Sequence, residues 1–156
     1  MNPNEHWLGS ELSHLRERAG HPDRLGGGPI EWSTREERDA FLVSLGEFAE
    51  QVAKRRGVRA CVVGHEGLVI AAAGWTEDAE RLAAVAQQCL LAGVDASCDA
   101  GLGDFEQTLV VGRELKVVMF HVGAMTIAIQ AHTGVDLAAS LGERGSPSPS
   151  TSGSAP

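Results

Sequence analysis

Three apolar segments in the second half of the chain follow one another with very little sequence between them. They cover about 106–112, 115–122 and 124–132. Connectors this short allow only hairpins between antiparallel strands. In the third segment apolar residues alternate from Met125 to Ala131, with more polar residues at most of the positions between them. This period of two predicts an antiparallel sheet whose two faces differ.

An amphipathic helix is predicted ahead of these strands, over about 34–56. Ser33 followed by Glu36 has the spacing of a capping box at its start, and Gly57 is the expected C′ residue after its end. Apolar residues recur along it at i, i+4, i+7 and i+11, which is one stripe of a helix. The stripe consists of Phe41, Leu45, Phe48 and Val52.

A hairpin and a second helix are predicted between these two regions. The hairpin joins strands over 58–63 and 68–73 through a tight turn at 64–67. The helix runs from about 77 to 93, and a short closing helix over 134–142 follows the last strand. The element order α-β-β-α-β-β-β-α predicts an α/β protein of the α+β type, with a largely antiparallel sheet and helices on its faces.

Three regions of the chain differ in composition. Residues 1–31 form a polar N-terminal extension, with a predicted short helix over 5–19 and then a Gly-rich linker. Residues 33–144 carry nearly all of the apolar periodicity and form the predicted domain. Residues 145–156 are a Pro/Ser/Gly-rich tail that is predicted to be disordered. Two serines of the tail precede proline, so it is either a solubilising segment or a substrate of a proline-directed kinase.

Composition and charge argue against several classes of partner. The 156 residues carry a net charge of −8 and are 43% hydrophobic, which fits one packed domain and disfavours nucleic acid as the main partner. The densest basic run, residues 54–56, is expected at a helix end, where the helix dipole favours cations. No apolar run reaches the ~18 residues that suggest a membrane span. Cys61, Cys89 and Cys98 lack CxxC spacing, so we expect a cytoplasmic protein with reduced cysteines.

The second predicted helix contains more apolar surface than one sheet can cover. From 82 to 93 the sequence is LAAVAQQCLLAG, in which only Gln87 and Gln88 are polar. A helix that is apolar around most of its circumference requires burial on more than one side, although exposed alanines are tolerated. We therefore expect a second chain to cover the outer side. The stripe expected to face the domain's own sheet is Leu82, Val85, Ala86 and Cys89, and the group outside it is Ala79, Ala83, Leu90 and Leu91.

Candidates for catalysis and metal binding are few. None of the histidines stands at HxxH, HxxxH or HExxH spacing, and no GxSxG, GKS or GKT motif is present. His121 and His132 lie on neighbouring predicted strands, but a metal there would need further ligands. We therefore predict no enzymatic activity, no cofactor and no metal site. The alternative is a small-molecule-sensing domain with a pocket over the sheet, lined by His121, Gln130 and His132.

Two long segments of the sequence resemble one known family. Residues 57–93, GVRACVVGHEGLVIAAAGWTEDAERLAAVAQQCLLAG, are similar to the first half of the roadblock/dynein light chain family, with a strand, a turn, an apolar strand and an Ala/Leu-rich helix. Residues 109–141 are similar to the remaining hairpins and closing helix of that family. Glu66 stands where an Asp is more usual. The resemblance implies a profilin-like fold with a five-stranded antiparallel sheet and helices on both faces.

The resemblance also implies a function and a set of contacts. Family members are dimers joined through the second helix and the central strand, and they serve small Ras-like GTPases as scaffolds or regulators. In bacteria they resemble polarity and motility regulators that are encoded with a GTPase. The chain is therefore expected to pair with itself or with a roadblock paralogue, and to contact a GTPase through Gln87, Gln88 and Leu91. The dimer contacts carried over are Leu82, Val85, Ala86, Cys89 and Leu90 on the helix and Thr108, Leu109 and Val110 on the third strand.

Overall fold

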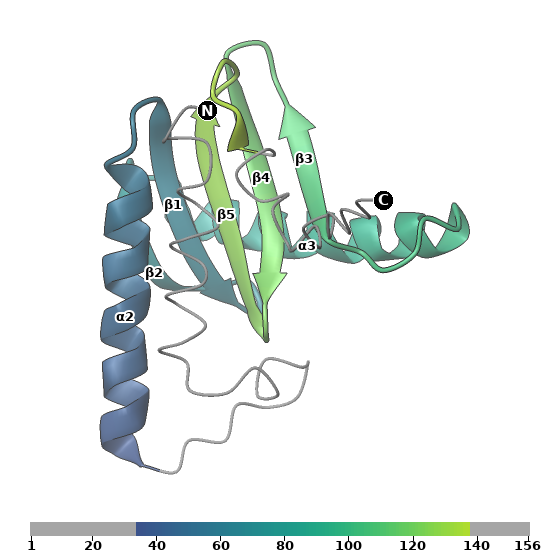
Figure 1. The fold of residues 1–156 in the computed structure, drawn as a ribbon. Helices are drawn as coiled ribbons and strands as arrows, with labels where there is room; N and C mark the ends of the chain where they lie inside the picture. Colours follow the sequence, from purple (N-terminus) through teal and green to yellow (C-terminus); the bar gives the residue numbers. More distant parts are fainter. Residues whose placement is uncertain (1–33, 138–156) are drawn as a thin grey trace, which may run out of the picture.

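The computed structural model describes residues 34–137, which form two helices on a five-stranded sheet (Figure 1). All neighbouring strands are antiparallel, in the order β2-β1-β5-β4-β3. The predicted fold class and element order are confirmed over these residues. The elements are α2 (Arg35–Ala53), β1 (Val58–His65), β2 (Leu68–Gly74), α3 (Ala79–Asp99), β3 (Gln107–Val111), β4 (Leu115–Val122) and β5 (Met125–His132).

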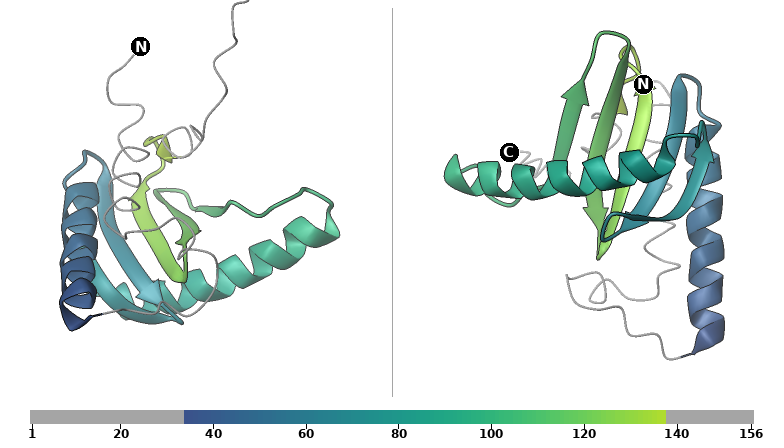
Figure 2. Two further views of the ribbon diagram at one scale, coloured as in Figure 1. Left: turned by 60° about the horizontal axis from the view of Figure 1, so that its bottom comes forward. Right: turned by 180° about the vertical axis from the view of Figure 1, so that it is seen from behind.

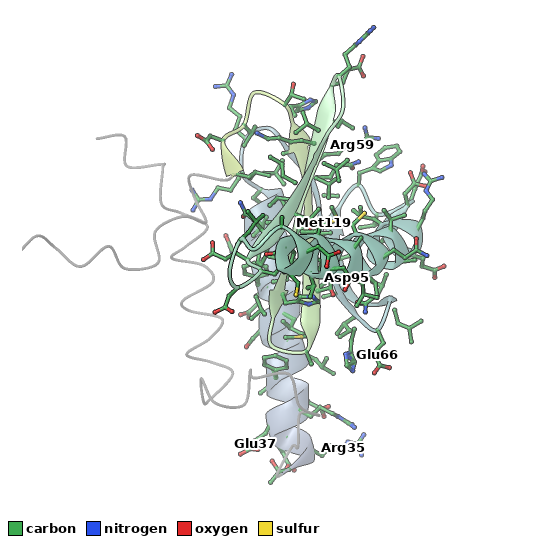
Figure 3. The ribbon with its side chains drawn as sticks, turned by 90° about the vertical axis from the view of Figure 1, so that its right-hand side faces the viewer. Arg35, Glu37, Arg59, Glu66, Asp95 and Met119 are labelled. Carbon is green, nitrogen blue, oxygen red and sulfur yellow. The ribbon has the colours of Figure 1, made fainter. Side chains whose placement is uncertain are left out.

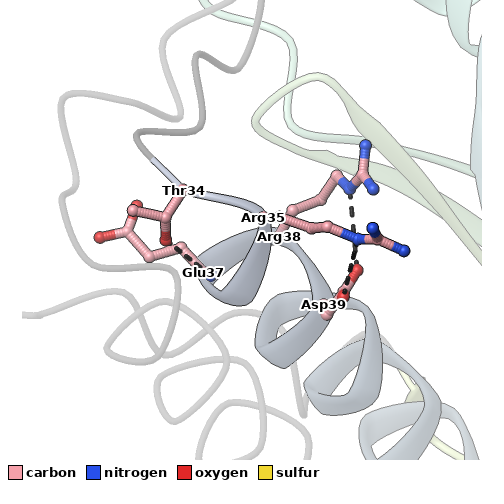
Figure 4. Close-up of polar contacts among 5 residues, drawn as sticks. All are labelled: Thr34, Arg35, Glu37, Arg38 and Asp39. Carbon is pink, nitrogen blue, oxygen red and sulfur yellow. Dashed lines mark hydrogen bonds and ion pairs between the residues drawn. The ribbon is translucent and has the colours of Figure 1, made fainter.

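The first turn of α2 is capped by a different residue from the one predicted. Thr34 is the N-cap, and its Oγ1 accepts a hydrogen bond from the Glu37 N–H at 3.1 Å (Figure 4). The predicted capping box was placed at Ser33, one residue earlier. Both positions satisfy the pattern of a hydroxyl followed three residues later by Glu, so the pattern alone does not distinguish them.

The end of α2 also differs from the prediction. The helix ends at Ala53 with Lys54 as its C-cap, so Gly57 lies beyond C′. Gly57 has a φ of 83° in the turn into β1, a conformation that favours glycine. A Cβ at this position would overlap Val135, which lies after β5. Gly57 therefore shapes the entry of the chain into the sheet.

One face of the sheet is covered by α2, which packs over β1 and β2 (Figure 2). Its predicted stripe from Phe41 to Val52 is confirmed, because all four residues are buried. The predicted difference between the two faces of β5 is also confirmed, since its odd-numbered residues belong to this core. Full burial of a large apolar side chain contributes about 1.5–3 kcal/mol, so this face is the main hydrophobic core. The strand residues in it include Cys61, Val63, Val118, Phe120, Met125, Ile127, Ile129 and Ala131.

The hairpin between β1 and β2 has a two-residue turn. Glu66 and Gly67 have φ values of 50° and 80°, and positive φ at both positions is what a type I′ turn requires. The turn is shorter than the predicted 64–67 because β1 continues to His65. A register irregularity at Val63/Gly64 accommodates this extension.

The opposite face of the sheet is crossed by α3, which extends past β3 (Figure 2). The helix continues to Asp99, whereas the prediction ended it at Gly93. Gly93 lies within the helix where its neighbours approach closely, because a Cβ there would be 2.6 Å from Phe105 Cε2 and 2.5 Å from Thr108 Oγ1. Gly93 is therefore a packing residue and not a helix terminator.

Several predictions concern residues that the structure does not describe. The closing helix was predicted over 134–142, but residues 134–136 are not helical; Leu137 is buried in the same core as α2, and residues 138–142 lie outside the described part. The predicted helix over 5–19, the Gly-rich linker and the Pro/Ser tail also lie outside it, so the domain boundaries stay predictions. Over residues 34–137, neither helix combines the length and apolarity needed to cross a bilayer.

Candidate functional site

The face of α3 that packs on the sheet is lined mainly by small residues. Ala79, Ala83 and Ala86 are buried there, followed by Leu90, which is 0% exposed. They pack against strand residues that include Met119, which lies beside α3 in Figure 3. Because alanine side chains are short, the helix can lie close to the strands beneath it.

The orientation of α3 differs from the prediction. Val85, predicted to face the sheet, is 44% exposed. Ala79, Ala83 and Leu90, predicted to lie outside the inward stripe, are buried against the sheet instead. The error has a physical cause: Ala, Val and Leu recur around the whole circumference, so hydrophobicity does not fix which side faces inward. Side-chain size does not fix the inward face either, since Leu90 is buried while Ala84, Ala92 and Ala96 are exposed.

Large apolar side chains stay exposed on the outer side of α3 and on both faces of β3, and we call them the α3–β3 surface. Val110 lies on the face of the sheet that α3 covers, together with Thr108, whereas Leu109 and Val111 lie on the face that α2 covers. The most exposed are Val111 at 61% and Leu91 at 57%. The two elements meet where Thr108 Oγ1 donates a hydrogen bond to the Cys89 carbonyl oxygen at 3.5 Å. A gathering of exposed apolar residues of this kind is typical of a protein interaction site. The surface consists of Val85, Leu91, Val94, Leu109, Val110 and Val111.

One of the two edges of the sheet, that of β3, is part of this surface; the other edge strand is β2. The predicted dimer contact was to a central strand, but β3 is the outermost strand, and within residues 34–137 its outer edge pairs with no other strand. Its sequence, QTLVV, contains no charge and no proline. Natural edge strands usually carry such features to prevent pairing with another chain. β3 lacks these features, and so does β2 (LVIAAAG) at the other edge, but β3 also lies beside the exposed apolar side chains of α3.

The predicted dimer contacts divide into accessible and inaccessible residues. Val85, Leu109 and Val110 are exposed on the α3–β3 surface. Ala86 and Leu90 are 0% exposed within the protomer. They pack between α3 and the sheet, so their side chains are not accessible to a partner. Half-buried between these two groups are Leu82, Cys89 and Thr108.

The predicted GTPase contacts also separate. Gln88 and Leu91 are exposed on α3. Gln87 is turned toward the sheet, where its Oε1 accepts a hydrogen bond from Thr126 Oγ1 at 3.2 Å. Two residues of the surface, Val94 and Val111, were missed in the prediction. Val94 falls after the predicted helix end at Gly93, and the exposure of Val111 follows from the edge position of β3, which local sequence does not reveal.

The histidines considered for a metal site or a ligand pocket do not come together in the described part of the chain. Over 34–137, no group of three or more His, Cys, Asp and Glu side chains is arranged to hold a metal ion. His121 pairs with Thr126 and His132 with Leu115, so the two histidines lie at opposite ends of the β4–β5 hairpin and do not meet. The polar residues proposed to line a ligand pocket therefore do not converge with His121.

Cys61 is buried in the core and is not an activated nucleophile. Burial raises the pKa of its thiol to about 12 because the charged thiolate would be desolvated. The thiol is therefore neutral at physiological pH and serves as a small apolar group.

The sheet order and the two helices define a small α+β domain, and the apolar α3–β3 surface is its candidate interaction site. Residues 46–131 match the family model of the Roadblock/LC7 domain, and the chain belongs to this family. Members of the family are regulatory proteins and not classical enzymes. The family predicted from the sequence is confirmed.

Solved structures agree with this fold. A Roadblock/LC7 domain from Streptomyces avermitilis is 23% identical, has a TM-score of 0.55, and the match covers 60% of this chain and 82% of that one. MglB from Myxococcus xanthus is 17% identical with a TM-score of 0.54, covering 62% and 81%. The gliding protein MglB from Thermus thermophilus is 15% identical with a TM-score of 0.51, covering 64% and 76%. No curated protein matches the chain.

Proposed function

We propose that the protein is a non-catalytic, cytoplasmic dimer that binds a small Ras-like GTPase and influences its nucleotide state or location. The observation that carries this proposal is the exposed apolar α3–β3 surface beside an uncharged, unpaired edge strand within residues 34–137. Membership of the Roadblock/LC7 family and the fold shared with MglB support it.

The dimer uses β3 and the outer side of α3 from each protomer. Pairing of two β3 edges satisfies the backbone N–H and C=O groups that the edge leaves open. The same contact covers Leu109, Val110 and Val111, which one protomer leaves exposed. Ala86 and Leu90 contribute indirectly, because their burial holds α3 in place. The partner is a second copy of the chain or a roadblock paralogue.

The GTPase binds the exposed part of α3 that includes Gln88 and Leu91. No residue of this chain takes part in the chemistry of hydrolysis. Any effect on nucleotide state arises because the protein binds one conformation of the GTPase switch loops more tightly than the other.

The dimer is tested with Val110→Asp, which places a carboxylate at the centre of the proposed interface. By light scattering at tens of micromolar, the native chain should show twice the 16.4 kDa mass of one chain. Val110→Asp should shift the mass toward one chain, because a buried unpaired carboxylate is costly. Val43→Asp is the matched control, since Val43 is also exposed, at 62%, but lies on α2. A native chain that is monomeric at this concentration contradicts the proposal.

The GTPase is tested by affinity capture from native lysate supplied with GDP or with a non-hydrolysable GTP analogue. Mass spectrometry should identify a small Ras-like GTPase that is enriched in one nucleotide state. Leu91→Asp should abolish the enrichment, whereas Val43→Asp should not, because Val43 is 62% exposed on α2, which covers the other face of the sheet. If neither nucleotide yields a small GTPase, the function proposed for this surface is wrong.

A further inference from the structure

Basic side chains from separate parts of the chain gather at one end of the sheet. Backbone hydrogen bonds bring these segments together: the His132 N–H donates to the Gly57 carbonyl at 2.9 Å, and the Thr133 N–H to the Glu114 carbonyl at 3.1 Å. Arg59 lies near this end, whereas Glu66 lies toward the other end of β1 (Figure 3). We call this group the cationic end; it consists of Lys54, Arg56, Arg59, Arg113 and Lys116, with Arg55 beside them.

The cations of this end differ from the other basic residues of the described chain in how they are paired. Elsewhere, Arg35 and Arg38 each lie 3.8 Å from Asp39, and Arg81 lies 2.8 Å from Asp78. Within residues 34–137, none of the five side chains that define the cationic end forms an ion pair. One of the five, Arg59, lies over the Trp75 ring, 5.2 Å from its centre.

A gathering of unpaired like charges is unfavourable without a counter-charge, and its potential attracts anions. The sequence of residues 54–56 alone was interpreted as a helix-end feature because three cations are too few for a binding patch. The fold adds Arg59, Arg113 and Lys116 from β1, the β3–β4 turn and β4, which local sequence does not associate.

The remaining charge distribution indicates what kind of anion fits. The chain carries a net charge of −8, and Asp95, Asp99, Asp104 and Glu106 follow one another with no basic residue between Arg81 and Arg113. Charges are screened over about 8–10 Å at physiological salt. A bilayer or a long polyanion is larger than this distance, so it would also come close to these carboxylates and be repelled by them. A short acidic segment meets only the local potential, where the five cations and Arg55 outnumber the exposed carboxylates of Glu114, next to Arg113, and Asp136, which follows Val135 beside Gly57.

We propose that the cationic end binds a short acidic peptide segment of a protein partner. This surface is separate from the outer face of α3 to which GTPase binding is assigned, and it does not depend on that function. Carboxylates of the segment pair with the guanidinium and ammonium groups of the five residues, most directly with the exposed Arg56 and Arg113.

The proposal is tested by fluorescence anisotropy with a rhodamine-labelled peptide of eight alternating Asp and Glu residues. The native full chain should bind it saturably in 50 mM salt, and binding should weaken as salt is raised to 300 mM. The variant Arg56→Glu/Arg113→Glu should bind at least about tenfold more weakly. The control Arg35→Glu/Arg38→Glu introduces the same charge change at exposed positions on α2 and should bind within about twofold of the native chain. Thermal melts establish that both variants are folded.

Three results would overturn the proposal. One is the absence of saturable binding by the native chain. Another is an equal loss in both double variants, which would mean that net charge alone governs the interaction. The third is tighter binding to phosphatidylserine vesicles or to a single-stranded oligonucleotide, lost in the Arg56→Glu/Arg113→Glu variant, which would assign the cationic end to a membrane or to nucleic acid instead.

Discussion

The two helices pack on opposite faces of one sheet, but they do so with side chains of different size. α2 fills its side of the sheet with Phe41, Leu45 and Phe48, which are all buried. α3 packs on the other side through three alanines and Leu90, and keeps Val85, Leu91 and Val94 on its outer side. When the large apolar side chains of a helix all face inward, they are used in the protomer's own core and few remain on its outer side. Small inward side chains leave the apolar surface of a helix available to another molecule.

The largest expected effect comes from placing a carboxylate on each side of α3. Leu90→Asp buries an unpaired charge at a position that is 0% exposed, and it should destabilise the protomer by about 3–5 kcal/mol. Val85→Asp, at a position that is 44% exposed, should leave the protomer folded. Circular dichroism and thermal unfolding of both variants measure the difference. If Leu90→Asp keeps native stability, the orientation of α3 is wrong.

A truncation in each helix tests the same contrast with apolar residues. Leu45→Ala removes a fully buried side chain of α2 and should lower the free energy of unfolding by about 2–5 kcal/mol. Leu91→Ala in α3 should change it by no more than about 0.5 kcal/mol. Urea unfolding should be measured in the Val110→Asp background, so that association does not contribute. If both variants lost a similar amount of unfolding free energy, Leu91 would be as much a part of the protomer's core as Leu45, and the proposed difference between the helices would be wrong.

Replacing one glycine in each helix by alanine should change the free energy of unfolding in opposite directions. Gly46 in α2 has no heavy atom within 4 Å of a built Cβ, so Gly46→Ala should stabilise the protein by about 0.5–1 kcal/mol. Gly93 in α3 has Phe105 and Thr108 in contact, so Gly93→Ala should destabilise it by about 1–3 kcal/mol, despite the better helix propensity of alanine. Chemical denaturation of the two variants gives both signs, and stabilisation by Gly93→Ala would show that α3 lies farther from β3.

The smallest effect is a difference in reactivity that leaves stability unchanged. Iodoacetamide at pH 8 should label exposed Cys98 first and half-buried Cys89 next. Cys61 should react only on global unfolding, because it is buried and its thiol has a pKa of about 12. Peptide mass mapping over time measures the order. Early labelling of Cys61 would mean that the core beneath α2 opens easily.

The sheet and its hairpins could be predicted because they depend on short-range features. Connectors of two or three residues fix the pairing of β3, β4 and β5, and the alternation in β5 fixes its two faces. The stripe of α2 could be predicted because its large residues occupy one side only. Each of these features is complete within a short stretch of sequence.

The candidate site was predicted less well, for three physical reasons. α3 carries apolar residues around its whole circumference, so its sequence alone does not show which side packs on the sheet. Gly93 resembles a helix terminator in sequence, and only its contacts with Phe105 and Thr108 show why it stands within the helix. The cationic end combines residues from several elements, so it exists only once the sheet has formed.

The uncharged edge of β3 also carries a risk for the molecule. A short stretch of valine and leucine with open backbone groups can join any compatible strand, including one from an unfolded or foreign chain. The dimer proposed above would cover this edge. A copy that has not yet paired would then be the form most exposed to aggregation, so stability in storage should improve as the protein concentration favours association.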